Sequence, residues 1–600
     1  MSPTVVDPST LSNHDQIQVV DQSLELVVDF ATSTLSGSVE LQCKVIGENV
    51  SQLILDTRDL DIKTVFVGET SVPFAIEQEV SPFGCPLVIT LPGNQSCGNI
   101  VTVIISYSTR PSGTAVQWLK PQQTSMGIYP FCFTQCQAIH ARSMLPCQDT
   151  PLVKSTYSAR ITVDPTLVAL MSALSSKAPV KSIHHTTYCF EQLVPIPSYL
   201  IALAVGHLES REIGPRSCVW AEPNVVDAAA DDFSETESFL KAAESICGRY
   251  VWGRYDILCL PPSFPYGGME NPCLTFVTPT LLTGDKSLAN VVAHEIAHSW
   301  HGNLVTNATW EHFWLNEGFT VYVERKIGGK IHGDPYFHFQ AIGGWNHLKE
   351  DVNHFGATSP LTKLCPDLKG IDPDDAFSSV PYEKGFNFLF YLENLFGRNA
   401  FESFLKKFIE SHKFHTVTTS QFQQDVQENF ASEPVKLSEI DWEAWLYSPG
   451  MPPVEPKFDQ SMLSVVDAAA RSWADSCPCD LSKFTSSQIV IFLDCLLEKS
   501  SKLNISLLEK IEAKCHFTEQ CNAEIKLRWF QLCLSLKYEP IVDHVVKFIT
   551  TQGRMKYVRP LYRCLFASGF ATETAVATFK KHRQFYHPIA EKMISHDLKL

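Results

Sequence analysis

The segment His294-Glu295-Ile296-Ala297-His298 constrains this chain more than any other feature, together with Glu317, which follows His298 after eighteen intervening residues. Leu288, Val291 and Val292 have helical spacing, and Asp285 or Ser287 is suited to cap the start, so a helix is expected here. Residues four apart lie on one face of a helix, and both imidazoles therefore aim at one point.

Two imidazoles and a carboxylate are a ligand set that suits one zinc ion per chain and leaves a position open for water. We therefore predict that His294, His298 and Glu317 bind Zn²⁺. Glu295 lies beside a ligand but cannot easily reach the same metal, and it is placed to act as a general base on water there. The plain alternative is an amphipathic helix with two solvated histidines.

Upstream lies Tyr266-Gly267-Gly268-Met269-Glu270-Asn271. Two adjacent glycines allow backbone groups to approach a ligand closely, and a carboxylate near the metal can pair with an ammonium group. Glu270 is thus a candidate for binding a free α-amine, which would restrict cleavage to the first peptide bond. Taken alone, the segment could equally be a turn that ends in a surface glutamate.

Together the zinc pattern and the G-x-M-E-N segment resemble the gluzincin aminopeptidases, and within them the branch that also hydrolyses the epoxide leukotriene A4 to leukotriene B4. Further matching stretches span nearly the whole chain; they are Gln135–His140, Leu145–Thr150, Ser263–Pro272, Ser379–Gly385, Gly553–Lys556 and the ending His587–Lys599.

The resemblance implies specific substrate contacts. The glycine loop forms a short edge strand along the substrate, with Gln137 beside Glu270 at the amine and Arg554 and Lys556 at a carboxylate. The substrate-binding residues that it implies are Gln137, Ala138, Tyr266, Gly267, Gly268, Met269, Glu270, Arg554 and Lys556. Two fixed substrate ends favour very short peptides, tripeptides above all. Arg554 and Lys556, two residues apart in an expected non-helical stretch, can face the same side, and the plain alternative is a solvated basic pair in a helical domain.

Two more residues receive roles from the resemblance. Tyr382 donates a hydrogen bond to the oxyanion of a tetrahedral intermediate, where the alternative is a half-buried core tyrosine. Asp374 directs water to a distant carbon of the epoxide, although most Asp-Pro-Asp segments are plain turns. The chain departs from the pattern at Phe377, where the vertebrate enzymes carry tyrosine, and this puts the geometry of lipid turnover in doubt.

The expected fold is a multidomain α+β protein. Alternating apolar residues such as Val39, Leu41, Cys43 and Val45 predict an N-terminal β-sheet-rich domain over residues 1–206. A thermolysin-like zinc catalytic domain is expected over 207–450, as the resemblance implies, then a Pro-rich linker over 451–460. Residues 461–600 have helical patterns throughout and predict a C-terminal all-helical layered domain.

A net charge of −17 argues against nucleic-acid binding through a basic surface. The N-terminal stretch from Met1 shows neither a charged nor an apolar signal region, and no apolar run reaches the length of a membrane span. We expect a cytoplasmic monomer. Cys132, Cys136 and Cys147 could suggest a second metal site, but their spacing lacks a matching second pair, and buried free thiols are the better interpretation.

The sequence thus predicts a zinc metallo-aminopeptidase that acts on short peptides and on leukotriene A4. Two rivals remain. One is an aminopeptidase without lipid activity, similar to aminopeptidase B. The other is a zinc-bearing peptide-binding scaffold whose catalysis is dispensable, against which the complete set of ligands and Glu295 argues.

Overall fold

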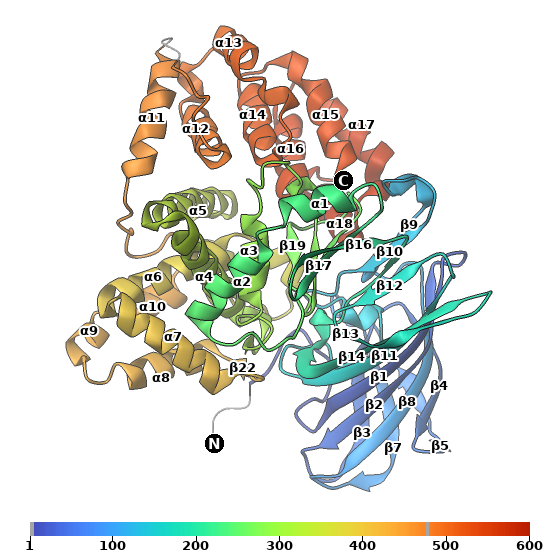
Figure 1. Cartoon of the computed structure of the whole chain (residues 1–600). Coiled ribbons are helices and arrows are strands. Elements are labelled where there is room, and N and C mark those ends of the chain that lie inside the picture. Colours follow the sequence, from blue (N-terminus) through green and yellow to red (C-terminus); the bar gives the residue numbers. More distant parts are fainter. Residues whose placement is uncertain (1–4, 476–478) are drawn as a thin grey trace.

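The computed structural model describes residues 5–475 and 479–600. The N-terminal stretch in which no signal region is expected begins with Met1–Thr4, which lie outside the described residues. Figure 1 shows three regions along the chain. Blue and cyan strands form the first, green and yellow helices with a small sheet form the second, and orange and red helices form the third. Among the described residues, no helix is both long enough and apolar enough to cross a bilayer.

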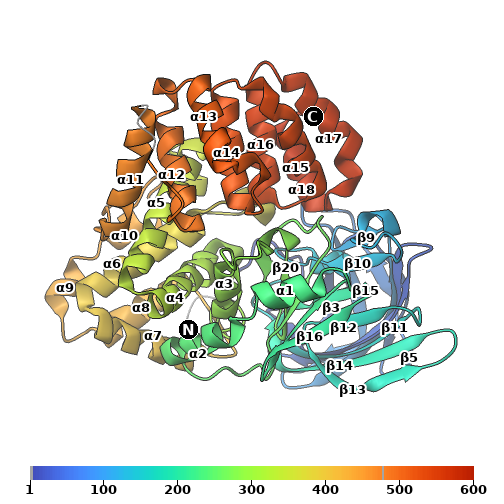
Figure 2. The same ribbon diagram turned by 45° about the horizontal axis from the view of Figure 1, so that its top comes forward.

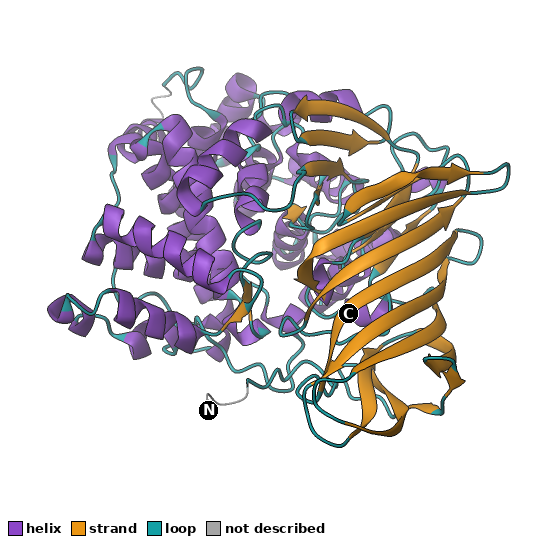
Figure 3. Cartoon of the chain, turned by 60° about the horizontal axis from the view of Figure 1, so that its bottom comes forward, coloured by secondary structure: helices purple, strands orange, loops and turns teal. Residues whose placement is uncertain are grey.

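A large eight-stranded sheet dominates the first region, and Figure 3 shows its strands side by side along one flank of the molecule. Strands β1 and β11 pair in parallel and the other neighbours antiparallel. In spatial order the strands are β13 (Leu174–Lys181), β14 (Thr186–Pro197), β11 (Lys154–Val163), β1 (Ile17–Asp29), β2 (Thr34–Val45), β8 (Ile100–Thr109), β4 (Leu60–Val67) and β5 (Thr70–Ser71).

Two smaller sheets complete this region. The three-stranded sheet consists of β3 (Val50–Thr57), β7 (Cys85–Gln95) and β6 (Phe74–Ile76). The four-stranded sheet consists of β12 (Val168–Met171), β15 (Leu203–Gly206), β10 (Phe131–Thr134) and β9 (Val116–Leu119). The predicted alternation is confirmed, because Val39, Leu41, Cys43 and Val45 on β2 are buried while the residues between them are more exposed.

The second region contains a five-stranded sheet that ends at an edge strand near the predicted zinc ligands. Its order is β16 (Glu209–Gly214), β17 (Ser217–Ala221), β18 (Asp256–Cys259), β20 (Leu274–Val277) and β19 (Gly268–Met269). Its helices are α1 (Val226–Asp232), α2 (Thr236–Cys247), α3 (Asn290–His298), α4 (Trp314–His332), α5 (Asp334–Phe355), α6 (Gly385–Phe396), α7 (Arg398–His412), α8 (Thr419–Asn429), α9 (Pro434–Ser438) and α10 (Trp442–Leu446). The short strands β21 (Thr306–Asn307) and β22 (Thr416–Val417) pair in parallel.

The third region is a row of helices, which Figure 2 shows packed beside one another. They are α11 (Ser461–Ala474), α12 (Ser486–Glu498), α13 (Ile505–Cys515), α14 (Ala523–Ser535), α15 (Val542–Thr551), α16 (Met555–Ala567), α17 (Thr572–His582) and α18 (Pro588–Asp597). Their buried side chains form a hydrophobic core of their own, whereas the first two regions share a continuous core. The zinc pattern lies in the second region, on helices α3 and α4.

Candidate metal centre and active site

Helix α3 carries the first two predicted ligands, and α4 carries the third. The Nε2 atoms of His294 and His298 lie 3.2 Å apart, and Glu317 Oε2 lies 3.5 Å and 3.3 Å from them. The predicted cap is wrong: α3 begins at Asn290, after Ala289, and no side chain caps it, while Asp285 instead accepts the backbone N–H of Ser287. The helix is held by its buried apolar face, so the missing cap does not disturb it.

The donor set fits a zinc ion. Ligands about 2.1 Å from a tetrahedral zinc lie about 3.4 Å from one another, close to the three observed separations. Glu317 Oε2 is buried and has no hydrogen-bond partner among the described residues, which is costly for a carboxylate without a cation. The three side chains are thus arranged around one point as a metal would require.

Two residues absent from the sequence predictions orient these ligands. Glu324 Oε2 lies 3.0 Å from His294 Nδ1, and Thr320 Oγ1 lies 3.1 Å from His298 Nδ1. The backbone carbonyl of His301 accepts from His298 Nδ1 at 2.9 Å. Partners on the outer nitrogen fix the tautomer that presents Nε2 to a metal. Glu324 follows Glu317 by two helical turns, so helical periodicity could have identified it.

The predicted base lies against the same point. Glu295 is 4% exposed, and its Oε2 has no hydrogen-bond partner in the described part of the chain. Burial raises the pKa of Glu295 to about 8, and the two nearby glutamates act in the same direction against the histidines. A bound dication would oppose this rise. A carboxylate with a free oxygen at this place is able to accept a proton from water.

The glycine segment forms the outer edge of the five-stranded sheet. Gly268 and Met269 make up β19, which pairs only on the side of β20 within the described chain, so its other edge is open to an extended peptide. Glu270 follows directly, is 4% exposed, and accepts a 3.4 Å hydrogen bond from Gln137 Nε2. Burial raises the pKa of Glu270, which an ammonium ion at the site would offset.

The carboxylate-binding candidates lie on the far side of the glycine segment. Arg554 immediately precedes α16 and is 6% exposed, its Nη1 donates to Tyr557 Oη at 2.8 Å, and its Nε has no partner among the described residues. Lys556 pairs with Glu524 at 2.7 Å, and Tyr557 donates to the same carboxylate. The expectation of a non-helical stretch is wrong, because Lys556 lies in the first turn of α16. Both cations nevertheless belong to one cluster.

Tyr382 lies in a single π-helical turn, Val380–Lys384, immediately before α6. Its ring stacks on His294 with centroids 6.1 Å apart and planes at 17°. Its hydroxyl makes no hydrogen bond within the described residues and is free for a ligand. A π-turn beside a metal site is a common device for directing a side chain inward.

A pocket with a cavity volume of about 60 Å³ lies beside this centre, lined by Gln137 and Pro381 among others. Ala138, Tyr266, Phe377 and Asp374 are among its lining residues, and most of the rest are apolar. Phe377 packs near Tyr266 and Tyr382, with ring centroids 5.9 Å and 6.1 Å away. The mostly apolar wall suits the apolar part of a ligand, and Asp374 adds a carboxylate to that wall.

These observations define a mononuclear metallohydrolase with an edge strand beside its metal. The chain belongs to peptidase family M1: it matches the Peptidase M1 N-terminal domain over residues 12–200, the Peptidase family M1 domain over 233–445, and the leukotriene A4 hydrolase C-terminal domain over 484–598. The predictions of family, fold class and a zinc metallopeptidase are therefore confirmed.

Individual relatives agree with this. A leukotriene A-4 hydrolase of Xenopus laevis is 45% identical, with 99% of each chain covered. A leucine aminopeptidase 2 of Coccidioides immitis is 42% identical, with 99% of this chain and 97% of that protein covered. The solved structure of yeast LTA4 hydrolase in complex with bestatin superposes with a TM-score of 0.93 at 39% identity, covering 100% of this chain and 98% of that one.

Proposed function

We propose that this protein is a zinc aminopeptidase that removes the first residue of short peptides, tripeptides above all, and that also hydrolyses leukotriene A4 to leukotriene B4. One observation carries the peptidase part. Ligand atoms of Glu270, Glu295 and His298 all lie within 4.8 Å of one another. An acidic group so near the metal ligands leaves room for a free amine but not for further residues before the cleaved bond.

The amine end of the substrate is held by Glu270, with Gln137 fixing the orientation of the carboxylate. The peptide lies along the open edge of β19, so its backbone groups pair with those of Gly268 and Met269. At the other end Arg554 and Lys556 receive the terminal carboxylate. Ala138 and Tyr266 line the apolar pocket together with Gln137 and are further substrate-binding residues of the proposal.

His294, His298 and Glu317 would hold a zinc ion, which when bound would supply a Lewis acid for the reacting carbonyl or epoxide and would lower the pKa of water. Glu295 removes a proton from the attacking water and delivers it to the leaving amine. Tyr382 donates its hydroxyl hydrogen to the developing oxyanion, which stabilises charge that is absent from the ground state.

For the epoxide, the carbon–oxygen bond breaks with its electron pair remaining on oxygen, and water adds at a distant carbon of the conjugated chain. Asp374 takes the proton that this water releases and returns it to solvent, and the alkoxide gains one proton from solvent, so one water is consumed overall. The apolar pocket with Asp374 in its wall supports this part of the proposal. An aminopeptidase without lipid activity remains the second candidate, because Phe377 supplies no hydroxyl beside Tyr266.

The same proposal keeps domain boundaries at 1–206, 207–450, 451–460 and 461–600, with a monomer in the cytosol. The cysteines in the described part are free thiols, including Cys132, Cys136 and Cys147, as a reducing compartment allows.

The test uses purified protein with a tripeptide, its N-acetylated form and leukotriene A4, each with and without a zinc chelator. We expect cleavage of the free tripeptide only, and leukotriene B4 from the lipid, both lost on chelation. Equal cleavage of the acetylated peptide would contradict the role of Glu270. Peptide cleavage without a lipid product would leave the aminopeptidase-only candidate, and no product from either substrate would favour the scaffold.

A further inference from the structure

The carboxylate of Asp374 contacts the side chain of His140, a residue of the N-terminal region. His140 Nε2 lies 2.8 Å from Asp374 Oδ2, and the two side chains are only 6% and 8% exposed. Asp374 lies in the short 3-10 helix Pro373–Ala376, where its backbone N–H donates to the Asp372 side chain. No described residue forms a hydrogen bond to Oδ1, so one oxygen is engaged and one is left.

His140 is itself held from three directions. Its ring Nδ1 lies 2.7 Å from Thr114 Oγ1. Its backbone N–H donates to Cys136 O, and its backbone carbonyl accepts from Ser143 Oγ at 2.9 Å. Since Nε2 faces a carboxylate, this nitrogen carries a proton, and Nδ1 lies within hydrogen-bond distance of the Thr114 hydroxyl. These contacts fix the orientation of the imidazole ring, with Nε2 toward Asp374.

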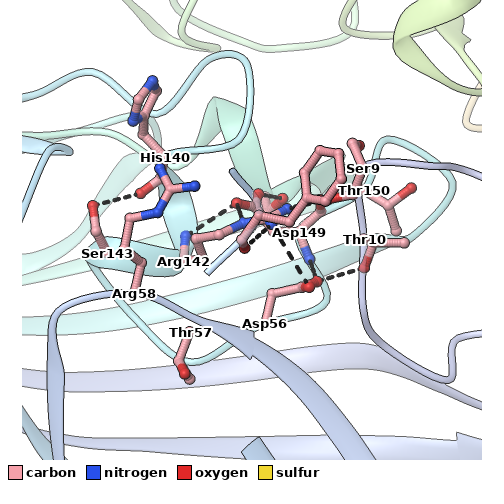
Figure 4. Close-up of polar contacts among 12 residues, drawn as sticks. Ser9, Thr10, Asp56, Thr57, Arg58, His140, Arg142, Ser143, Asp149 and Thr150 are labelled. Atoms are coloured by element: carbon pink, nitrogen blue, oxygen red, sulfur yellow. Dashed lines mark hydrogen bonds and ion pairs between the residues drawn. The ribbon is translucent and has the colours of Figure 1, made fainter. Parts of the chain in front are cut away.

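The backbone around His140 is anchored by a buried ionic cluster. Arg142 is fully buried, donates through Nε to Asp149 at 2.9 Å, and lies 3.8 Å from Asp56. Figure 4 shows this cluster, with the imidazole of His140 pointing away from it. Charges paired and hydrogen-bonded at 0% exposure make a rigid base, because moving either partner exposes an unpaired charge.

The third region fixes the other side of the Asp374 turn. Lys592 on α18 pairs with Asp372 at 2.9 Å and with Asp375 at 3.2 Å. Although burial opposes ionisation, His140, Lys592 and Arg58 together keep the pKa of Asp374 below its usual value. This segment thus holds an ionised carboxylate, and the contact with His140 limits the orientation of that carboxylate.

We propose that His140 is a positioning residue that engages Oδ2 of Asp374 and so directs Oδ1 into the pocket. This rests on the proposed function, in which Asp374 guides water on the lipid; we extend it to a cationic first side chain of a peptide, which the same oxygen would recognise. The rival interpretation is an ion pair that only joins two regions of the fold. The two interpretations differ in substrate dependence, because a joining contact would affect all substrates alike.

The test compares His140→Leu, His140→Gln and the milder Thr114→Val with wild type. The measured quantities are kcat/KM for an Arg-first and an Ala-first tripeptide, the distribution of dihydroxy acids from leukotriene A4 by chromatography, and Tm. The matched control is His412→Leu, which removes another histidine–aspartate pair, 2.6 Å from Asp425, between α7 and α8.

We expect His140→Leu to lower the ratio of Arg-first to Ala-first kcat/KM about tenfold and to reduce the share of leukotriene B4 among the dihydroxy acids. Glutamine, which keeps an N–H donor, should restore part of both, and Thr114→Val should change both in the same direction by a smaller factor. Adding His140→Leu to Asp374→Asn should cause little further change in the ratio, because the two act as one unit. His412→Leu should leave both readouts unaltered.

An unchanged ratio and an unchanged product distribution in His140→Leu and Thr114→Val would overturn the proposal, whatever happens to Tm. If His140→Leu fails to fold, Thr114→Val alone decides the question by the same criteria. A wild type that gives no dihydroxy acid would refute the lipid part of the proposed function instead. The peptide ratio would then still test His140, so the two failures are distinguishable.

Discussion

Two adjacent glycines, Gly267 and Gly268, allow the proposed catalytic base Glu295 and the proposed carboxylate-binding residue Arg554 to be perturbed separately. A Cβ on Gly268 would lie 2.2 Å from Glu295 Oε1 and 2.4 Å from its Cδ, whereas a Cβ on Gly267 would lie 2.5 Å from Arg554 Nη2. Ordinary contacts between such atoms are about 3.5 Å, so in each variant the neighbouring side chain must move by roughly 1 Å. Neither substitution alters a metal ligand.

The two glycine variants should affect different kinetic parameters. A misplacement of about 1 Å in a reacting group costs on the order of 100-fold in rate, or about 2.7 kcal/mol, so Gly268→Ala should lower kcat by that factor with zinc content unaltered. Gly267→Ala should instead raise KM roughly tenfold for a tripeptide with a free C-terminus, since it disturbs a charge-assisted contact. Amidating the peptide should remove this second effect.

The assay is steady-state kinetics on free and amidated tripeptides, with elemental analysis of each variant. Gly343→Ala is the control, because its Cβ would meet Ile491 Cδ1 at an ordinary 3.6 Å. A wild-type kcat in Gly268→Ala would refute the placement of Glu295 as the base against β19. Identical kinetic profiles for the two glycine variants would refute their separate roles.

Four further outcomes are expected. Glu317→Ala should lose most of its zinc by elemental analysis; full retention would refute the ligand set. Glu295→Gln should keep zinc but lose at least about 100-fold in peptide turnover, and a near-wild-type rate would point to another base. Asp374→Asn should abolish leukotriene B4 formation, measured by chromatography, and an unchanged yield would refute its role. Burial lowers the pKa of Lys154 from 10.5 to about 7, so the unfolded chain binds more protons between these values and stability rises with pH there; Lys154→Met should flatten Tm across pH 7–10, and an unaltered slope would contradict this.

Features set by local geometry could be predicted from the sequence. The proposed zinc ligands lie on two successive helices, α3 and α4, and helical periodicity alone brings His294 and His298 to one face. The same periodicity places Glu324, two turns after Glu317, on the face of α4 that carries Glu317. The alternation that predicted β2 is also local, because each strand buries one face. The absent cap of α3 shows the limit, since burial rather than capping holds that helix.

Contacts between regions could not be predicted in this way. His140 and Asp374 are separated by 234 positions, and their pairing depends on how a sheet domain packs on the central region. Glu524 meets Lys556 only because α14 and α16 lie together. No spacing rule connects such residues, so sequence reasoning reached Asp374 and Lys556 only through resemblance and missed their partners.

The placement of Arg554 shows how substrate length can be coupled to domain packing. Gly553 N–H donates to Pro262 O and Met555 N–H donates to Pro265 O, both at 2.8 Å. The segment that accepts these bonds leads directly into β19, which carries the proposed amine end of the substrate site. The two ends of the site are therefore fixed to one another through a few residues of backbone, although they belong to different regions of the chain. Loosening this attachment should relax the preference for tripeptides without removing zinc, because the metal ligands lie on α3 and α4 and share none of these bonds.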